Sequence, residues 1–208
     1  MDRWVAWHEA YDVAGSALGM RLSLVAGHIR RAVEALPPGE VRLVSLCAGQ
    51  GHDVVRALAG HPRRGDVRGG LVELNPTNAG IARERVAGAG LDGLRVVEAD
   101  AGDTGSFVEF VPADVVLVCG VFGNIGDEDI RRTVLALPEL AAPGGTVVWT
   151  RHRREPDVPE RIRGWFAEGG FREVAFDAPP ELGIGVGVHQ LVGAPRPLTT
   201  RRLFSFKQ

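Results

Sequence analysis

The sequence contains few of the features that mark secreted, membrane-bound or metal-dependent proteins. Its two cysteines, Cys47 and Cys119, provide no disulfide framework, and we interpret them as small apolar residues in a reducing, cytoplasmic environment. No signal peptide is recognisable and no apolar run is long enough to span a bilayer, so no membrane association is expected. Cysteine, histidine, aspartate and glutamate nowhere cluster at metal-ligand spacing, so no metal ion is expected.

An excess of positive charge is also missing. The 208 residues carry a formal net charge of −2, and Lys207 is the only lysine. Without a basic field, nucleic acid is disfavoured as a partner. The apolar fraction of 45% and the charged fraction of 24% are typical of a globular protein, and the length suits one large domain.

The chain is organised around a predicted strand, a glycine-containing loop and a helix. An apolar run with β propensity, residues 41–46, is followed by Gly49 and Gly51 and then by a helical pattern from Asp53. In such a corner, backbone N–H groups and the helix dipole face a nucleotide, and glycine allows its close approach. Taken alone, an ordinary strand–helix turn explains the pattern equally well.

Strand and helix patterns alternate through the rest of the chain. The further expected elements are strands at 71–74, 94–97, 114–118 and 146–150, helices at 76–89, 127–137 and 157–168, and a loop at 61–70. Two last strands, 171–176 and 184–192, are joined too closely for a crossover helix and should be antiparallel. We therefore expect a doubly wound, Rossmann-like α/β fold with a mostly parallel seven-stranded sheet and an antiparallel C-terminal hairpin.

Two helical segments precede this corner. The first carries four side chains on one predicted face: Trp4, Trp7, His8 and Tyr11. The second, residues 18–36, repeats apolar residues at helical spacing. We interpret residues 1–40 as an N-terminal helical lid or appendage and residues 41–208 as the nucleotide-binding domain. For the aromatic face, covering the pocket and plain core packing are equally good alternatives.

In a doubly wound sheet, ligands bind beyond the carboxyl ends of the strands, near the point where the strand order reverses. This rule selects five stretches: 47–51, 73–75, 100–101, 119–124 and 151–152. Glu73 lies about 22 residues after Gly51, a spacing that suits an acid accepting both hydrogen bonds of a ribose diol, although a salt-bridge role is the alternative. Asp100 can accept from an adenine amino group or cap the segment after it.

With these stretches in order, the chain resembles the class I S-adenosylmethionine (SAM)-dependent methyltransferases over residues 41–192. Residues 45–51 stand at the place of their glycine-rich motif, Glu73 at that of the ribose-binding acid, and Asp100 with Ala101 at that of the adenine-contacting pair. The fourth-strand motif and the Pro-Gly-Gly turn before the fifth strand are also matched. Within the family, the chain is similar to actinobacterial members that carry Cys-Ala-Gly-x-Gly, Gly-Val-Phe-Gly-Asn-Ile and Trp-Thr-Arg-His-Arg.

The resemblance implies SAM as the cofactor and a SAM-binding methyltransferase domain in residues 41–208. The expected cofactor-binding residues are Cys47, Ala48, Gly49, Gln50, Gly51, Asp53, Glu73, Leu74, Asn75, Asp100, Ala101, Cys119 and Gly120. The sequence departs from the family pattern at Ser45, where an acid is usual, and at Cys47, which replaces the first glycine. Asp53, Gln50, backbone carbonyls or the N-terminal aromatic segment must then hold the methionine end.

The expected reaction is methyl transfer to an O, N or C nucleophile of a small molecule. An in-line displacement needs no enzyme nucleophile, but a general base assists a protonated acceptor, and His152 and Tyr11 are the candidates. The expected substrate-binding residues are Trp7, His8, Phe122, Asn124 and Arg151.

The arginine-rich run 151–154 has more than one interpretation. It can bind an anionic acceptor or RNA, and the favoured alternative is a solvated loop whose arginines pair with Glu155, Asp157 and Glu160. Other functions also stay open: a methyltransferase acting on RNA or protein, a dehydrogenase, or a SAM binder without turnover. No third glycine follows Gly51 at dinucleotide-motif spacing, which argues against a dehydrogenase. A homodimer is one assembly that the sequence allows.

Overall fold

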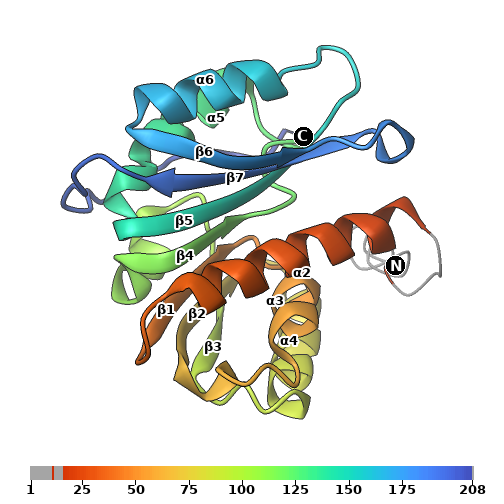
Figure 1. Cartoon of the computed structure of the whole chain (residues 1–208), viewed down its shortest axis with the longest axis vertical. Helices are drawn as coiled ribbons and strands as arrows, with labels where there is room; N and C mark the ends of the chain where they lie inside the picture. The colour runs from red at the N-terminus through yellow and green to blue at the C-terminus, as the bar shows by residue number, and fades with distance from the viewer. Residues whose placement is uncertain (1–10, 12–15, 208) are drawn as a thin grey trace.

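The computed structural model describes Tyr11 and residues 16–207, and in this part of the chain seven strands form one sheet in the order β3-β2-β1-β4-β5-β7-β6 (Figure 1). The strands are β1 (Val41–Leu46), β2 (Val67–Glu73), β3 (Leu94–Glu98), β4 (Ala113–Val118), β5 (Ala141–His152), β6 (Phe171–Asp177) and β7 (Ile184–Leu191). Strands β1 to β5 pair in parallel, whereas β7 is antiparallel to both β5 and β6. The expected doubly wound fold with its antiparallel C-terminal hairpin is confirmed.

Five α-helices connect or precede these strands in the described residues. They are α2 (Ala17–Ala35), α3 (His52–Leu58), α4 (Pro76–Gly88), α5 (Asp127–Ala136) and α6 (Pro159–Glu168). Within the same residues, no helix combines the length and the apolar character needed to cross a membrane.

Two apolar cores lie on the two faces of the sheet. On one face, strand residues such as Val116 and Trp149 pack with residues of α5 and α6. On the other face, Leu43 and Val148 pack with residues of α2, α3 and α4. Because successive strand side chains point to opposite faces, a strand covered on both sides is apolar on both, as β4 is from Val115 to Val118.

Helix α2 is built from the amphipathic pattern that the sequence predicts at 18–36. Ser16 caps it, since the Ser16 side chain accepts from the N–H of Gly19 at 2.9 Å. Its apolar positions Val25, Ile29 and Val33 are fully buried in the core shared with α3 and the sheet, and Figure 1 shows α2 crossing one face of the sheet. The division of the chain at residue 40 stays a prediction.

The prediction of a loop at 61–70 is wrong for its second half, because β2 already begins at Val67. The glycines that suggested a loop are required by strand packing instead. A Cβ on Gly69, whose φ is +145°, would lie 1.8 Å from the carbonyl oxygen of Leu43. Backbone pairing with β1 thus decides the start of β2, and side-chain patterns do not report such pairing.

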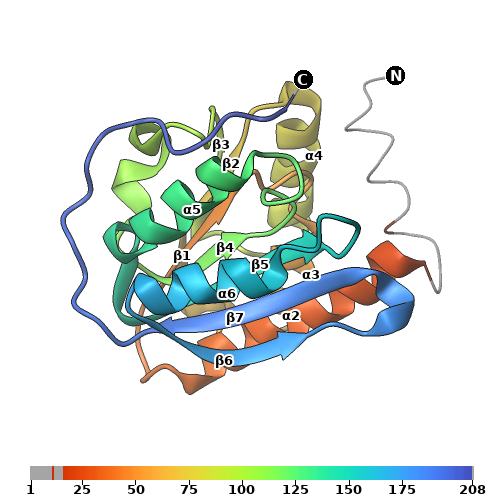
Figure 2. The ribbon, with the colours of Figure 1, turned by 90° about the horizontal axis from the view of Figure 1, so that it is seen from above.

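The C-terminal tail, residues 194–207, returns along the domain, as its dark blue trace shows in Figure 2. Its anchor is Glu139, whose carboxylate accepts from the Arg201 guanidinium at 2.7 and 2.8 Å and from the Thr199 N–H at 3.0 Å. Beyond this anchor, Leu203 and Phe204 are buried in the core. The last described residues therefore lie beside the carboxyl ends of β3 and β4.

Candidate functional site

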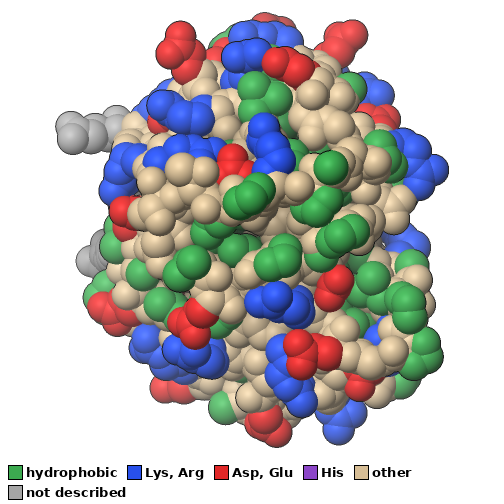
Figure 3. Space-filling view, turned by 90° about the vertical axis from the view of Figure 1, so that its left-hand side faces the viewer, with side chains coloured by type: hydrophobic (Ala, Val, Ile, Leu, Met, Phe, Trp, Pro, Cys, Tyr) green, Lys and Arg blue, Asp and Glu red, His purple; other side chains and the backbone are tan. Residues whose placement is uncertain are grey.

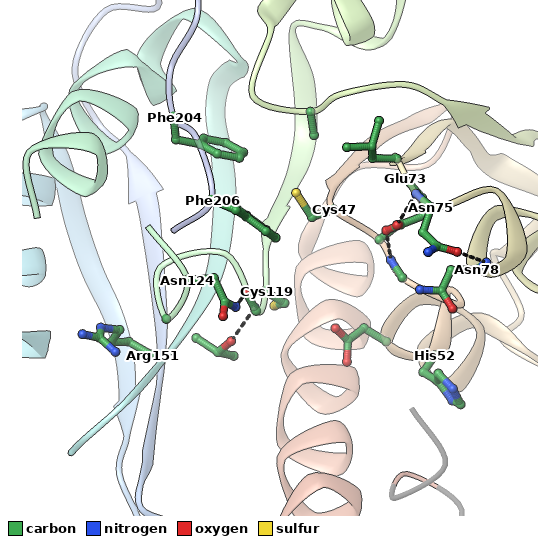
Figure 4. A pocket seen from close by; sticks show the side chains of 18 of the residues that line it. Cys47, His52, Glu73, Asn75, Asn78, Cys119, Asn124, Arg151, Phe204 and Phe206 are labelled. Carbon is green, nitrogen blue, oxygen red and sulfur yellow. Dashed lines mark hydrogen bonds between the residues drawn. The ribbon is translucent and has the colours of Figure 1, made fainter. Parts of the chain in front are cut away.

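A cavity of about 850 Å³ opens at the carboxyl ends of the parallel strands. It lies where the strand order reverses between β1 and β4, the position at which doubly wound sheets bind ligands. In Figure 4, Glu73, Asn75 and Asn78 lie across the cavity from Asn124 and Arg151. The predicted site residues that line it are Tyr11, Cys47, Ala48, Gly49, Asp53, Glu73, Leu74, Asn75, Asp100, Ala101, Cys119, Gly120, Asn124, Arg151 and His152.

The glycine-rich loop and the end of β2 are joined through one carboxylate. Glu73, which is 9% exposed, accepts from the N–H of Gly49 with one oxygen and from that of Asn75 with the other, each at 2.8 Å. The loop reaches this geometry through positive φ angles at Cys47 (53°), Gly49 (56°) and Gly51 (73°). Cys47 therefore adopts a conformation that favours glycine, which is the residue usual at this place in the resembling family.

Behind this loop, a polar group holds the start of α3. Gln50 donates to Asn78 Oδ1 at 3.2 Å, and its Oε1 lies 3.3 Å from His52 Nε2. Neither Gln50 nor Gly51 lines the cavity, so the structure places these two predicted cofactor residues one layer behind it. Asn75 caps α4, as the sequence predicts, by accepting from the Asn78 N–H at 3.0 Å.

An ion pair between the buried Arg21 of α2 and the partly exposed Asp53 of α3 lines the cavity. Arg21, which is 4% exposed, donates to Asp53 Oδ2 at 3.4 Å and to Thr150 Oγ1 at 3.5 Å, and it also contacts the Tyr11 hydroxyl. Arg21 is not among the site residues predicted from the sequence, although the sequence carries one signal for it. Arg21 lies one helical turn before the buried Val25, so it is a charge on the apolar face of an amphipathic helix.

At the end of β3, Asp100 lines the cavity and is held in place by two contacts. Its Oδ1 accepts from the Gly102 N–H at 2.8 Å, and its Oδ2 accepts from both terminal nitrogens of Arg202 at 3.0 Å. The hydrogen bond to Gly102 fits the turn that follows β3, and Arg202 brings the C-terminal tail to this edge of the cavity.

The far side of the cavity consists of the ends of β4 and β5. The Gly120 N–H donates to Thr150 Oγ1 at 2.9 Å, and the Gly120 carbonyl accepts from Asn124 Nδ2 at 2.7 Å. These bonds fix the loop after β4 with Asn124 at the cavity. Phe122 does not line it: this predicted substrate residue is fully buried, with its ring centroid 5.9 Å from that of Trp149, because the loop turns its side chain into the core.

The C-terminal tail contributes a wall that the sequence analysis did not assign. Arg202, Phe204, Ser205 and Phe206 all line the cavity, and the rings of Phe204 and Phe206 stack with centroids 6.0 Å apart. The backbone N–H of Lys207 donates to the Asn124 carbonyl at 2.8 Å, which closes the tail onto the loop after β4. The aromatic spacing of residues 203–206 was the only signal for this wall.

The titratable groups of the cavity differ in their protonation. Burial raises the pKa values of the Cys47 and Cys119 thiols, so neither is a thiolate nucleophile at neutral pH. Burial likewise raises the pKa of Tyr11, which remains a phenol. Burial and the neighbouring charges of Arg151 and Arg154 lower the pKa of His152, so its imidazole is neutral.

The predicted aromatic face of the N-terminal segment is described only at Tyr11. Trp4, Trp7 and His8, three of the four side chains on the predicted aromatic face, lie outside the described residues, so covering of the pocket by this face stays a prediction. Tyr11 itself is 9% exposed, and its ring stacks on that of His52 with centroids 4.6 Å apart. In the part of the chain that the structure describes, no three Cys, His, Asp or Glu side chains are placed to hold a metal ion.

Comparison with known proteins identifies the fold. No family model and no curated protein matches the sequence. Among solved structures, CurJ carbon methyltransferase aligns with a TM-score of 0.67 at 18% identity, over 92% of this chain and 59% of that chain. Magnesium protoporphyrin IX methyltransferase from Synechocystis, solved with bound S-adenosylhomocysteine (SAH), aligns with a TM-score of 0.68 at 10% identity, over 88% and 91%.

A third similar structure is an O-methyltransferase family 2 protein from Planctomyces limnophilus in complex with apigenin. It aligns with a TM-score of 0.61 at 21% identity, over 92% of this chain and 62% of that chain. The present chain thus spans about three fifths of the length of the CurJ and Planctomyces proteins. At such identities the likeness shows the fold alone, which is the fold that these methyltransferases share.

Proposed function

We propose that this chain is a SAM-dependent methyltransferase that acts on a small molecule. The observation that carries the proposal is the placement of Glu73 at the end of β2, where two backbone N–H groups orient its carboxylate at the cavity. A carboxylate oxygen can accept more than one hydrogen bond, so the same side chain can hold the two hydroxyls of a ribose.

The ion pair of Arg21 and Asp53 suits the methionine end of SAM. Asp53 Oδ1 is buried and has no hydrogen-bond partner within the described residues, which favours an ammonium group as its partner. The guanidinium of Arg21 beside it suits a carboxylate. Together the two residues compensate for the acid that is usual at the position of Ser45. At the other end, Asp100 and Ala101 remain the candidates for the adenine.

The chemistry requires mainly that an acceptor be held dry and in line. Bound SAM would supply an electrophilic methyl group on a sulfonium, for which the acceptor would provide the electron pair of the new bond while the C–S pair stays with sulfur. The ends of β4 and β5, with Asn124 and Phe206, form the wall against which the acceptor can be held at about 3 Å. Where the acceptor carries a proton, the neutral imidazole of His152 is the candidate to take it once Nε2 is released from its contact with Arg151, whereas the phenol of Tyr11 cannot.

A small acceptor is supported by the cavity of about 850 Å³ and by the charge pattern of the surface. Figure 3 shows arginine and acidic side chains interspersed over one face of the molecule, without a continuous basic stripe on that face. Recognition of nucleic acid usually needs such a stripe. RNA and protein acceptors therefore rank below a small molecule.

Calorimetric titration with SAM, SAH and NAD⁺ tests the proposal. We expect SAM and SAH to bind far more tightly than NAD⁺, and Glu73→Ala to weaken binding of both by about 1–3 kcal/mol, the cost of removing a partner from buried groups. Glu98→Ala is the matched control, since Glu98 pairs in register with Glu73 across β2 and β3 but is exposed and does not line the cavity. Tighter binding of NAD⁺ would overturn the assignment.

A further inference from the structure

The charged groups that line the cavity are paired on one side and unpaired on the other. Arg21 pairs with Asp53, and Arg202 pairs with Asp100. By contrast, Arg151 and Arg154 form no ion pair with any carboxylate in the described residues, although both line the cavity. The β5 end of the cavity therefore carries two arginines that form no direct ion pair with the described residues.

Arg151 is the more informative of the two because it is buried. It is only 5% exposed, and its Nε is a buried donor without a hydrogen-bond partner within residues 16–207 and Tyr11. Its Nη1 contacts His152 Nε2, which leaves the Nε edge of the guanidinium as a two-donor fork. Leaving a buried charged donor unpaired is costly, so a site that keeps one is suited to an incoming acceptor group.

The nearest acids do not neutralise Arg151. Asp127 and Asp157 attract its charge through space, but Asp127 pairs with Arg161 at 2.8 Å and Asp157 pairs with Arg153 at 2.8 Å. The solvated-loop interpretation of the arginine run therefore holds for Arg153. Arg151 lies within β5 and is buried, whereas Arg153 and Arg154 follow the end of the strand at His152 and are exposed.

We propose that Arg151, with Arg154 and His152, binds an anionic group of the methyl acceptor, either a carboxylate or a phosphate monoester. A planar guanidinium edge presents two parallel N–H donors, which matches two oxygens of either group. Arg154, which is exposed at the rim, adds positive charge, and the neutral imidazole of His152 orients Arg151 through the contact at Nε2. The acceptor role rests on the proposed methyltransferase function, whereas the binding of an anion does not.

The test is a calorimetric titration of the SAH-loaded protein with three probes of similar shape: benzoate, phenyl phosphate and the neutral benzamide. We expect at least one anion to bind more tightly than benzamide, and Arg151→Gln to weaken that anion by roughly 10- to 100-fold, the loss expected for charge-assisted hydrogen bonds. Benzamide and SAH should bind Arg151→Gln as they bind the wild type. Which anion loses more affinity distinguishes a carboxylate site from a phosphate site.

Arg153→Gln is the matched control, because Arg153 belongs to the same run but is exposed and paired with Asp157. The proposal is overturned if no anion is preferred over benzamide, or if Arg153→Gln and Arg151→Gln weaken anion binding equally. If Arg151→Gln unfolds and so loses SAH binding, Arg154→Gln replaces it in the comparison. It should weaken anion binding more than Arg153→Gln does. A wild type that fails to bind SAH would contradict the proposed function instead, and the same titrations of the unloaded protein would still test the anion site.

Discussion

The two sides of the cavity differ in whether their charged side chains have partners within the described residues. On the side of β1 to β3, each charged group has a partner within the chain: Glu73 has backbone N–H groups, Asp53 has Arg21, and Asp100 has Arg202. On the side of β5, Arg151 has no carboxylate partner in the described residues. The side with paired charges suits a ligand that brings both an ammonium and a carboxylate or is held by hydrogen bonds, and the side with unpaired arginines suits a ligand with a net negative group.

The largest expected difference between the two sides is in stability. Arg21→Met should lower the free energy of unfolding by about 1–3 kcal/mol, because it leaves the partly buried carboxylate of Asp53 without its ion-pair partner. Arg151→Met removes a buried charge without leaving an acid unpaired, so it should cost less than about 1 kcal/mol or even stabilise the protein. Urea unfolding of both variants measures the difference.

Adding Asp53→Asn to Arg21→Met should recover part of that loss, since the unpaired charge is then removed. Equal losses for Arg21→Met and Arg151→Met would contradict the proposed contrast. They would mean that packing of the alkyl stems, rather than pairing of charge, dominates at both positions.

The cofactor side should also be more sensitive to the loss of a single hydrogen-bond acceptor. Glu73→Gln keeps the shape of the side chain but replaces one carboxylate oxygen by a donor that faces a backbone N–H. We expect SAH binding to weaken by about 1–3 kcal/mol, with binding of benzoate unchanged. A parallel loss for both ligands would show that the two sides do not act separately.

The free energy of unfolding is expected to depend on pH through His189, which lies on β7 beside β5. His189, on β7, accepts from Trp149 Nε1 at 3.1 Å, and burial lowers its pKa to about 4. Because the unfolded chain binds this proton more readily, the stability from neutral His189 is complete above its unfolded pKa and is lost as the pH falls toward the folded pKa. Between about pH 7 and pH 5 the loss should be about 2 kcal/mol.

Urea unfolding at these two pH values, in the wild type and in His189→Gln, measures that loss. The glutamine can still accept from the Trp149 N–H but does not titrate, so the variant should lose less stability over the same interval. If the pH dependence is the same in both proteins, another group is responsible.

The smallest effect is expected where the tail meets the cofactor side. The pair of Arg202 and Asp100 is half exposed, so Arg202→Met should change stability by less than about 1 kcal/mol. It also leaves Asp100 able to accept from a ligand, so SAH should bind as tightly as before or more tightly. Weaker SAH binding would show instead that Arg202 positions Asp100 for the ligand.

The parts of the site that the sequence predicts are those built by neighbouring residues. Asn75 caps α4 through Asn78, three residues away, and Glu73 follows from the end of one strand. Turn and cap chemistry of this kind depends on residue types within a few positions. Residues of the glycine-rich loop, Glu73 at the end of β2 and Asp100 after β3 therefore line the cavity as local patterns suggest, and their binding of a cofactor stays a prediction.

The parts that the sequence does not reveal depend on contacts between distant residues. Arg21 meets Asp53 across 32 positions, and Arg202 meets Asp100 across 102. No local pattern encodes such pairings, because the chain between them sets the geometry. Phe122 and Asn124 show the same limit at short range, since both follow β4 but the loop turns one inward and leaves the other at the cavity.

Hydrophobic periodicity and strand-end positions are local properties, so the residues alone predict the α/β alternation, the edge of the sheet at which the cavity opens and the presence of Glu73 there. The tertiary structure alone decided which arginines are paired. Arg151 and Arg153 are indistinguishable as residues of one basic run, yet one is buried without a carboxylate and the other is exposed beside Asp157. Pairing and burial depend on what each side chain meets after folding, and these decide whether a charge is available to a ligand.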